Sequence, residues 1–144
     1  MQGNHIHYLC EADDRKALWR GMQGLSIRIA KGLNRVLDTS GKVFADRYHS
    51  RVLSTPLQVR RALAYVLNNI RKHSHFGQPP PWWIDDLSSA RWFDGWSYPP
   101  APRFPDAHQR GIPAARSWLL CVGWRRHGLI DVREIPSRGV ASTR

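Results

Sequence analysis

The segment Thr55-Pro56-Leu57-Gln58 constrains the fold more than any other, because it assigns the start of a helix to one residue. A threonine followed three residues later by a glutamine forms a capping box, in which each side chain binds the backbone N–H of the other residue. Proline suits the first helical position, where its missing N–H leaves no hydrogen bond unmade. We therefore predict a helix that starts after Thr55 and runs to about His73.

This predicted helix has two chemically different sides, separated by the rotation of about 100° per residue. The apolar side, which should face a sheet, consists of Val59, Leu63, Val66, Leu67 and Ile70. The opposite side consists of Arg61, Tyr65, Asn69 and Lys72. The pattern therefore predicts that Tyr65 lies outside the core, facing solvent or a partner.

A second amphipathic pattern follows Asp13-Asp14, a pair that can cap a helix. Apolar residues recur at three- and four-residue intervals from Leu18 to Val36, which predicts a long helix ending near Leu37. Glycines within it weaken it by roughly 1 kcal/mol each relative to alanine, unless close packing requires them. Its other faces carry Arg15, Lys16, Arg20, Arg28, Lys31 and Arg35.

Two segments have the pattern of β-strands. Residues 5–12 alternate between two faces, which is typical of a half-buried strand, and residues 42–53 contain β-branched and aromatic residues. Gly3-Asn4 suits a tight hairpin turn, yet only two residues precede it. We therefore expect the chain to begin partway into a domain, through a truncated gene or a misplaced start.

The second half of the chain differs in composition. Residues 78–81 and 99–105 are proline-rich, and four of the seven tryptophans lie between them, at 82, 83, 92 and 96. These rings would stack on unpaired bases or, more simply, fasten an irregular tail onto the domain. We predict a boundary near residue 75, with a domain at 1–75 and an extension at 76–144. A short helix is expected from Pro113 to about His127, with Gly128 as its stop.

The charge indicates a polyanionic partner. The 144 residues include 22 Lys and Arg against 11 Asp and Glu, a net charge of +11 that is spread along the chain. Nucleic acid fits this excess best, and the alternative is a solvated basic surface that only aids solubility. The two distant cysteines predict neither a disulfide framework nor a metal pair, and no segment resembles a membrane span or signal peptide. We expect a cytoplasmic, nucleoid-associated protein.

His5 and His7 are the candidate metal ligands. On a strand their rings project from one face, about 7 Å apart at the backbone, which permits them to share a divalent metal. Such a pair on a solvent-facing strand is also consistent with two ordinary polar residues. Asn69 lies one helical turn after Tyr65 and would complete the site, with Asn68 as an alternative ligand and a surface amide as the ordinary interpretation.

Three segments carry a family resemblance: residues 2–9 (QGNHIHYL), residues 43–49 (VFADRYH) and residues 65–69 (YVLNN). Together they resemble the REP-associated tyrosine transposases, a type of single-tyrosine HUH transposase, over roughly residues 1–75. Residues 88–93 and 124–128 resemble an extension that some members carry. The family normally has a strand, a helix and a second strand before Gly3-Asn4, so this chain would lack the first part of the fold.

The resemblance implies an α/β fold, with a ferredoxin-like antiparallel sheet and helices packed on one face. It implies that Mg²⁺ or Mn²⁺ is held by His5, His7 and Asn69, and that Tyr65 attacks single-stranded or hairpin DNA to form a 5′-phosphotyrosine link. A homodimer is one expected arrangement. The basic residues expected to contact DNA are Arg28, Lys31, Arg35, Arg47, Arg61, Lys72, Arg125 and Arg126.

Two other functions remain open. A replication initiator or relaxase uses the same chemistry, but the order of histidines before tyrosine disfavours it. A catalytically inactive, basic nucleic-acid-binding remnant is the non-enzymatic alternative. Tyr8 and Tyr48 are rival nucleophiles by residue type, and both rank below Tyr65 because they lie on predicted strands.

Overall fold

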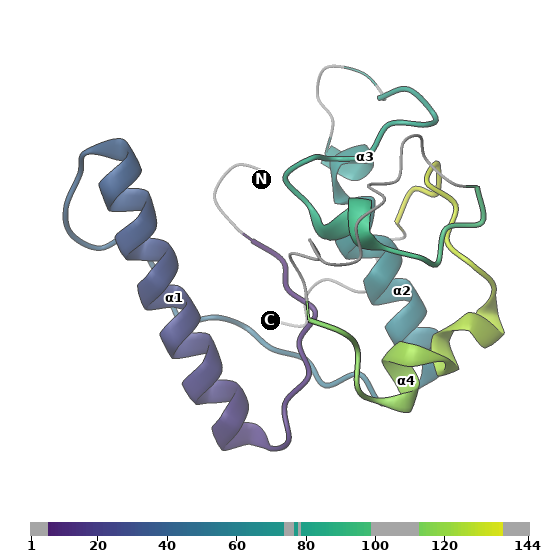
Figure 1. Ribbon diagram of the computed structural model, residues 1–144, viewed down its shortest axis with the longest axis horizontal. Helices are drawn as coiled ribbons and strands as arrows, with labels where there is room; N and C mark the ends of the chain where they lie inside the picture. The colour runs from purple at the N-terminus through teal and green to yellow at the C-terminus, as the bar shows by residue number, and fades with distance from the viewer. Residues whose placement is uncertain (1–5, 74–76, 78, 99–112, 137–144) are drawn as a thin grey trace. The chain divides into compact units, whose positions relative to one another are not determined.

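The computed structural model describes residues 6–73, 77, 79–98 and 113–136, and the elements in these ranges are helical (Figure 1). The α-helices are α1 (Arg15–Leu37), α2 (Pro56–Leu67), α3 (Asn69–His73) and α4 (Trp118–Cys121). Two short 3₁₀ helices are η1 (Ser89–Trp92) and η3 (Gly123–His127). Irregular segments connect these elements.

The predicted ferredoxin-like sheet is wrong, because the described residues contain no β-strand. Residues 6–12 and 42–53, both predicted as strands, are irregular. An alternating pattern specifies which side chains share a face, but a strand also needs a neighbour to hydrogen-bond with, and the described part of the chain supplies none to these segments. Ladder pairing within the described ranges is limited to one parallel bridge, between Trp96 and Ile130. The predicted hairpin turn at Gly3-Asn4 lies outside the described residues.

Contacts divide the chain into two compact units. The α1 unit is Cys10–Val52, and the α2 unit combines Met1–Leu9 with Leu53–Arg144. Residues on either side of position 75 therefore belong to the same unit. The functional division into a domain and an extension near that position stays a prediction.

Helix α1 has the ends that the sequence predicts. The Asp14 side chain accepts a hydrogen bond from the N–H of Ala17 at 2.7 Å, and Asp38 ends the helix with a left-handed backbone, φ 50°. The Asn34 side chain then ties down the following turn through the Gly41 carbonyl at 3.0 Å. Although α1 has 23 residues, no helix in the described ranges is long and apolar enough to cross a membrane.

Helix α2 begins with the predicted capping box. The Thr55 hydroxyl accepts from the Gln58 N–H, and the Gln58 side chain accepts from the Thr55 N–H, both at 3.3 Å. The helical path reaches His73 as predicted, but it is interrupted at Asn68, which caps α2 before α3 starts. At this break the Asn68 backbone leaves the α-helical region, with φ -104° and ψ 16°, and its side chain contacts a distant segment.

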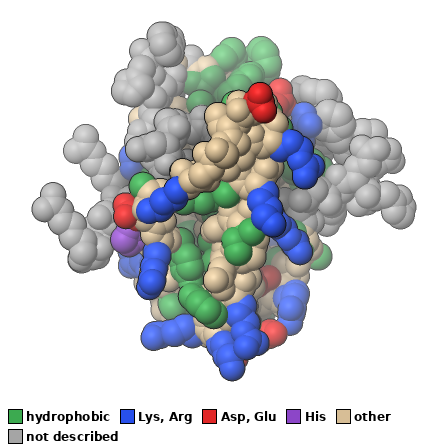
Figure 2. All heavy atoms as spheres, turned by 90° about the vertical axis from the view of Figure 1, so that its left-hand side faces the viewer, with side chains coloured by type: hydrophobic (Ala, Val, Ile, Leu, Met, Phe, Trp, Pro, Cys, Tyr) green, Lys and Arg blue, Asp and Glu red, His purple; other side chains and the backbone are tan. Residues whose placement is uncertain are grey.

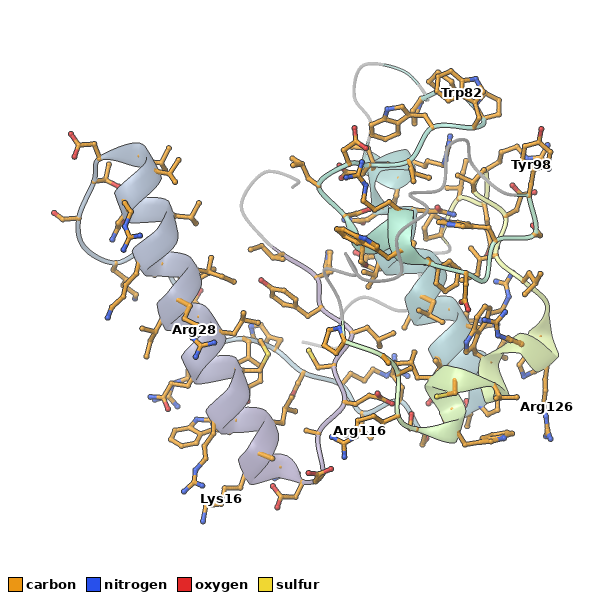
Figure 3. All side chains as sticks on the ribbon, in the orientation of Figure 1. Lys16, Arg28, Trp82, Tyr98, Arg116 and Arg126 are labelled. Atoms are coloured by element: carbon orange, nitrogen blue, oxygen red, sulfur yellow. The ribbon has the colours of Figure 1, made fainter. Side chains whose placement is uncertain are left out.

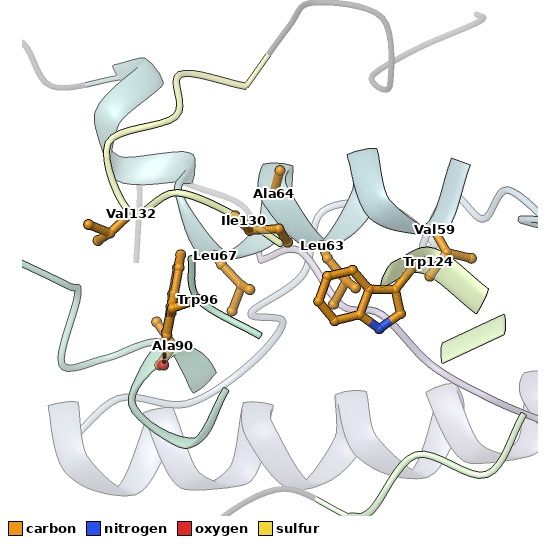
Figure 4. Packing of buried hydrophobic residues seen from close by; sticks show 9 residues of the cluster. All are labelled: Val59, Leu63, Ala64, Leu67, Ala90, Trp96, Trp124, Ile130 and Val132. Carbon is orange, nitrogen blue, oxygen red and sulfur yellow. Dashed lines mark hydrogen bonds between the residues drawn. The ribbon is translucent and has the colours of Figure 1, made fainter. Parts of the chain in front are cut away.

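The core of the α2 unit surrounds this helix (Figure 4). Four α2 residues enter it: Val59, Leu63, Ala64 and Leu67. The other buried members come from the C-terminal half: Ala90, Trp96, Trp124, Ile130 and Val132. The irregular segments thus contribute to the apolar core. Of the four tryptophans expected to fasten the extension, Trp96 is buried in this core, whereas Trp82 is 56% exposed.

Asn68 and Arg60 hold the C-terminal segment on α2. The buried Asn68 amide donates to the carbonyls of Asp131 and Glu134, both at 2.9 Å. Arg60 donates to the carbonyls of Gly128 and Leu129 and, through both terminal nitrogens, to the Glu134 carboxylate at 2.7 and 2.8 Å. The hydrogen bonds that Arg60 donates to Glu134 raise the pKa of Arg60. These contacts join positions more than 60 residues apart in the sequence.

Arg71 of α3 plays the same role for the proline-rich segment. Arg71 is 5% exposed, and its guanidinium donates to the carbonyls of Pro79 at 3.0 Å, Pro80 at 2.9 Å and Trp83 at 3.0 Å. Burial lowers the pKa of Arg71, and the charge of Asp131 opposes that shift. A hydrogen bond from Arg133 in turn lowers the pKa of Asp131 to about 2, so the carboxylate stays charged at neutral pH.

The helix predicted at 113–127 is shorter than expected. Ser117 caps α4 by accepting from the Leu120 N–H at 3.3 Å, so residues 113–116 remain outside it. At Val122 the backbone leaves the α-helical region, and η3 continues to His127. Gly128 ends η3 with φ +85°, as predicted for a glycine stop.

Candidate functional site

Tyr65 and His7 meet in the α2 unit. The Tyr65 hydroxyl lies 3.4 Å from Nε2 of His7, and the two rings pack edge to face with centroids 4.9 Å apart. Helix α2 supplies the tyrosine, and the irregular segment before α1 supplies the histidine. A weakly acidic hydroxyl therefore lies beside a nitrogen that accepts a proton in one imidazole tautomer.

The prediction that Tyr65 lies outside the core is wrong, since its side chain is only 7% exposed. The helical wheel assumed that one side of α2 faces a sheet and the other faces solvent. In the structure α2 packs against α3, α4 and η3, while His7 covers Tyr65. A helix that packs against several elements buries side chains on more than one side.

Lys72 provides a positive charge at this position. Its Nζ lies 4.7 Å from the centroid of the Tyr65 ring, close enough for a cation–π interaction. The spacing of seven residues is about two helical turns, which keeps both side chains on one face across the interruption at Asn68. A positively charged group therefore lies against the ring that carries the Tyr65 hydroxyl.

The predicted metal ligands are placed only in part. His5 lies outside the described residues, while His7 touches Tyr65 and Asn69 is the first residue of α3. Asn68, the alternative ligand, is 2% exposed and anchors the C-terminal segment. Within the described ranges, no three His, Cys, Asp or Glu residues are grouped as a metal site would require. The predicted set of His5, His7 and Asn69 contains only two residues of these four types, so this finding does not test it.

Five of the eight basic residues predicted to contact DNA are exposed and have no side-chain contact described above. Exposed side chains without a specific structural role are Arg28, Lys31, Arg35, Arg47 and Arg61. The first three lie on α1 at three- and four-residue spacing, and Lys and Arg side chains are prominent on the face of α1 seen in Figure 2. Arg28, labelled on α1 in Figure 3, is one of these exposed residues. These side chains are available to phosphates.

Arg125 and Arg126 are neighbours with different environments. Arg125 forms an ion pair with Asp94 at 2.8 Å and lies 4.7 Å from the centroid of the buried Trp124 ring. Arg126 lies 4.8 Å from the centroid of Trp118, which is 49% exposed. Arg125 thus serves packing, whereas Arg126 belongs to an open aromatic surface.

Comparisons with protein-family models, with curated proteins and with solved structures find no match for this chain.

The contacts of three residues were not predicted from the sequence: Arg60, Arg71 and Trp118. The partners of Arg60 and Arg71 include backbone carbonyls of remote or irregular segments, and no side-chain pattern in the sequence marks such contacts. Trp118 carries no clear signal either, because eight residues of continuous α-helix would separate it from Arg126 by about 12 Å along the axis. The two side chains meet because the backbone leaves the α-helical region at Val122.

Proposed function

We propose that this protein nicks and rejoins single-stranded DNA through a 5′-phosphotyrosine link formed by Tyr65. The observation that carries the proposal is the contact between the Tyr65 hydroxyl and His7 Nε2 at 3.4 Å, with Lys72 against the same ring. The net charge of +11 and the exposed arginines of α1 support a polyanionic substrate.

The chemistry needs one proton acceptor and one stabilised anion. When Nε2 of His7 is unprotonated, it accepts the phenolic proton as the tyrosine oxygen bonds to the scissile phosphorus. The phosphorus–O3′ bond breaks, and the leaving 3′ oxygen acquires a proton. Lys72 favours the charge that develops on the phenol oxygen and attracts the phosphate. In the reverse step a 3′-hydroxyl attacks the phosphotyrosine, and Tyr65 leaves and recovers its proton, so no external energy source is required.

The donor chemistry of the predicted metal set suits a divalent ion, because imidazole nitrogens and an amide oxygen both serve as ligands in proteins. We propose His5, His7 and Asn69 as the residues that would hold Mg²⁺ or Mn²⁺. A bound ion would polarise the scissile phosphate. His7 would have to divide its two ring nitrogens between the ion and the Tyr65 hydroxyl.

A covalent-capture assay tests the proposal. The full chain is incubated with labelled hairpin DNA carrying single-stranded flanks, with and without Mn²⁺, and separated on a denaturing gel. The expected result is a protein–DNA adduct that Tyr65→Phe abolishes and His7→Ala reduces about 100-fold or more. Tyr8→Phe and Tyr48→Phe serve as matched controls, and both should retain the adduct.

A second candidate function is nucleic-acid binding without cleavage. The exposed basic residues of α1 favour it, and it does not require the sheet that the family resemblance implied. If the unmutated protein binds the hairpin but forms no adduct under any metal condition, the nicking proposal is rejected and this candidate remains.

A further inference from the structure

The Trp118 ring is held against the backbone at Gly123. A methyl group at position 123 would lie 2.7 Å from Cζ3 and 2.9 Å from Cε3 of the indole, closer than real contacts allow. Only glycine therefore lets the ring lie this close to the start of η3. Nearly half of the Trp118 side chain, 49%, nevertheless remains exposed to solvent. A large apolar ring is thus fixed in orientation while much of its surface stays open.

Arg126 adds a cation to this ring. Its guanidinium carbon lies 4.8 Å from the Trp118 ring centroid, and among the described residues Arg126 has no ion-pair partner. The labelled side chain reaches the periphery of the α2 unit in Figure 3. Its neighbour Arg125, by contrast, is neutralised by Asp94 and lies over a buried indole. The charge of Arg126 is therefore available to a ligand.

We propose that Trp118 and Arg126 form a binding site for an unpaired nucleobase and its phosphate in single-stranded DNA. The exposed indole surface supplies a stacking platform, because every base presents a flat π surface. The guanidinium donates to a phosphate oxygen beside the stacked base. The choice of DNA follows from the proposed function, and the site lies on α4 and η3 rather than at Tyr65.

The charge around the ring favours a nucleotide over an apolar protein partner. Arg126 supplies this charge, because its guanidinium lies over the Trp118 ring, whereas Arg125 is paired with Asp94. An apolar peptide would gain nothing from Arg126 and would have to desolvate it, whereas a phosphate neutralises it.

Fluorescence anisotropy with a labelled single-stranded oligonucleotide tests the site. Every protein carries Tyr65→Phe, so binding is read without cleavage and is independent of whether the unmutated chain forms an adduct. Trp118→Ala should weaken binding roughly 5- to 100-fold. Trp118→Phe should recover most of the affinity, because it keeps an aromatic surface. Arg126→Lys should weaken binding a few-fold, because it keeps the charge but loses the planar donor.

Trp82→Ala is the matched control, since Trp82 is 56% exposed and has no cation over its ring among the described residues. It should bind as the parent does. Equal losses in Trp82→Ala and Trp118→Ala would overturn the site, as would unchanged binding in Trp118→Ala. A blunt-ended duplex should bind the parent and Trp118→Ala alike, and an equal loss on the duplex would overturn the stacking role. Arg126→Lys keeps the test decisive if Trp118→Ala fails to fold.

Discussion

Helices α1 and α2 have similar amphipathic patterns but different degrees of burial. Helix α1 has 23 residues, of which Met22 is buried, while α2 has 12 residues, of which six are buried. Trp19 of α1 is 53% exposed, whereas Trp124, which packs beside α2, is 1% exposed. The two helices begin with equally clear caps, so local signals do not account for the difference.

The source of the packing partners accounts for it. Helix α2 is covered by residues from the C-terminal half, including Trp96, Trp124, Ile130 and Val132. Among the described residues, the side-chain hydrogen bonds at the end of α1 instead join Asn34 to Thr39 and Gly41, a few residues beyond it. An apolar stripe predicts that a helix packs against another segment, but it does not identify that segment.

The largest expected effect comes from removing the buried indole ring that packs beside α2. Trp124→Ala should lower the free energy of unfolding by about 3–5 kcal/mol, because it leaves a cavity beside the helix. Urea unfolding followed by circular dichroism measures the change. The matched variant Trp19→Ala on α1 should change stability by less than about 0.5 kcal/mol. Equal losses in both variants would break the contrast between the helices.

An intermediate effect is expected from the ionic anchor. Arg60→Met should cost about 1–3 kcal/mol, because it removes the Glu134 pair and two bonds to carbonyls at a side chain that is 16% exposed. Arg28→Met on α1 removes the same charge from an exposed side chain and should be nearly neutral. Hydrogen exchange in residues 128–134 gives a second measurement, since these amides should lose protection only in the Arg60 variant.

The smallest effect concerns glycines, and its sign should differ between the two units. Gly24 of α1 has nothing within 4 Å of an added methyl group, so Gly24→Ala should raise helix stability by up to about 1 kcal/mol. Gly95 packs directly against Trp124, so Gly95→Ala should be destabilising. Thermal unfolding of both variants measures the two shifts. A stabilised Gly95→Ala would mean that the indole moves aside at no cost.

Helix ends were predictable because their causes are local. Asp14, Thr55 with Gln58, and Gly128 each act within a few residues, and the structure confirms all three. The sheet was not predictable, because residues 6–12 show which side chains alternate but not whether a partner strand exists. The prediction that Tyr65 lies outside the core failed for the same reason, since His7, which packs against its ring, comes from another part of the chain.

The candidate site was predictable in part. The expected approach of His7 to Tyr65 is observed at 3.4 Å, while its catalytic role and the metal stay predictions. Asn68 was interpreted as an alternative ligand, yet its amide binds carbonyls at 131 and 134. Nothing in the sequence distinguishes an amide that binds a remote backbone from one that binds a metal.

The Arg71 contacts have a consequence for how this protein can vary. The guanidinium recognises main-chain oxygens at 79, 80 and 83, and every residue type offers the same oxygen. Substitutions of the side chains at these positions would therefore preserve the Arg71 hydrogen bonds, provided that the backbone conformation is unchanged. Substitution of the single arginine, in contrast, would release the whole path at once.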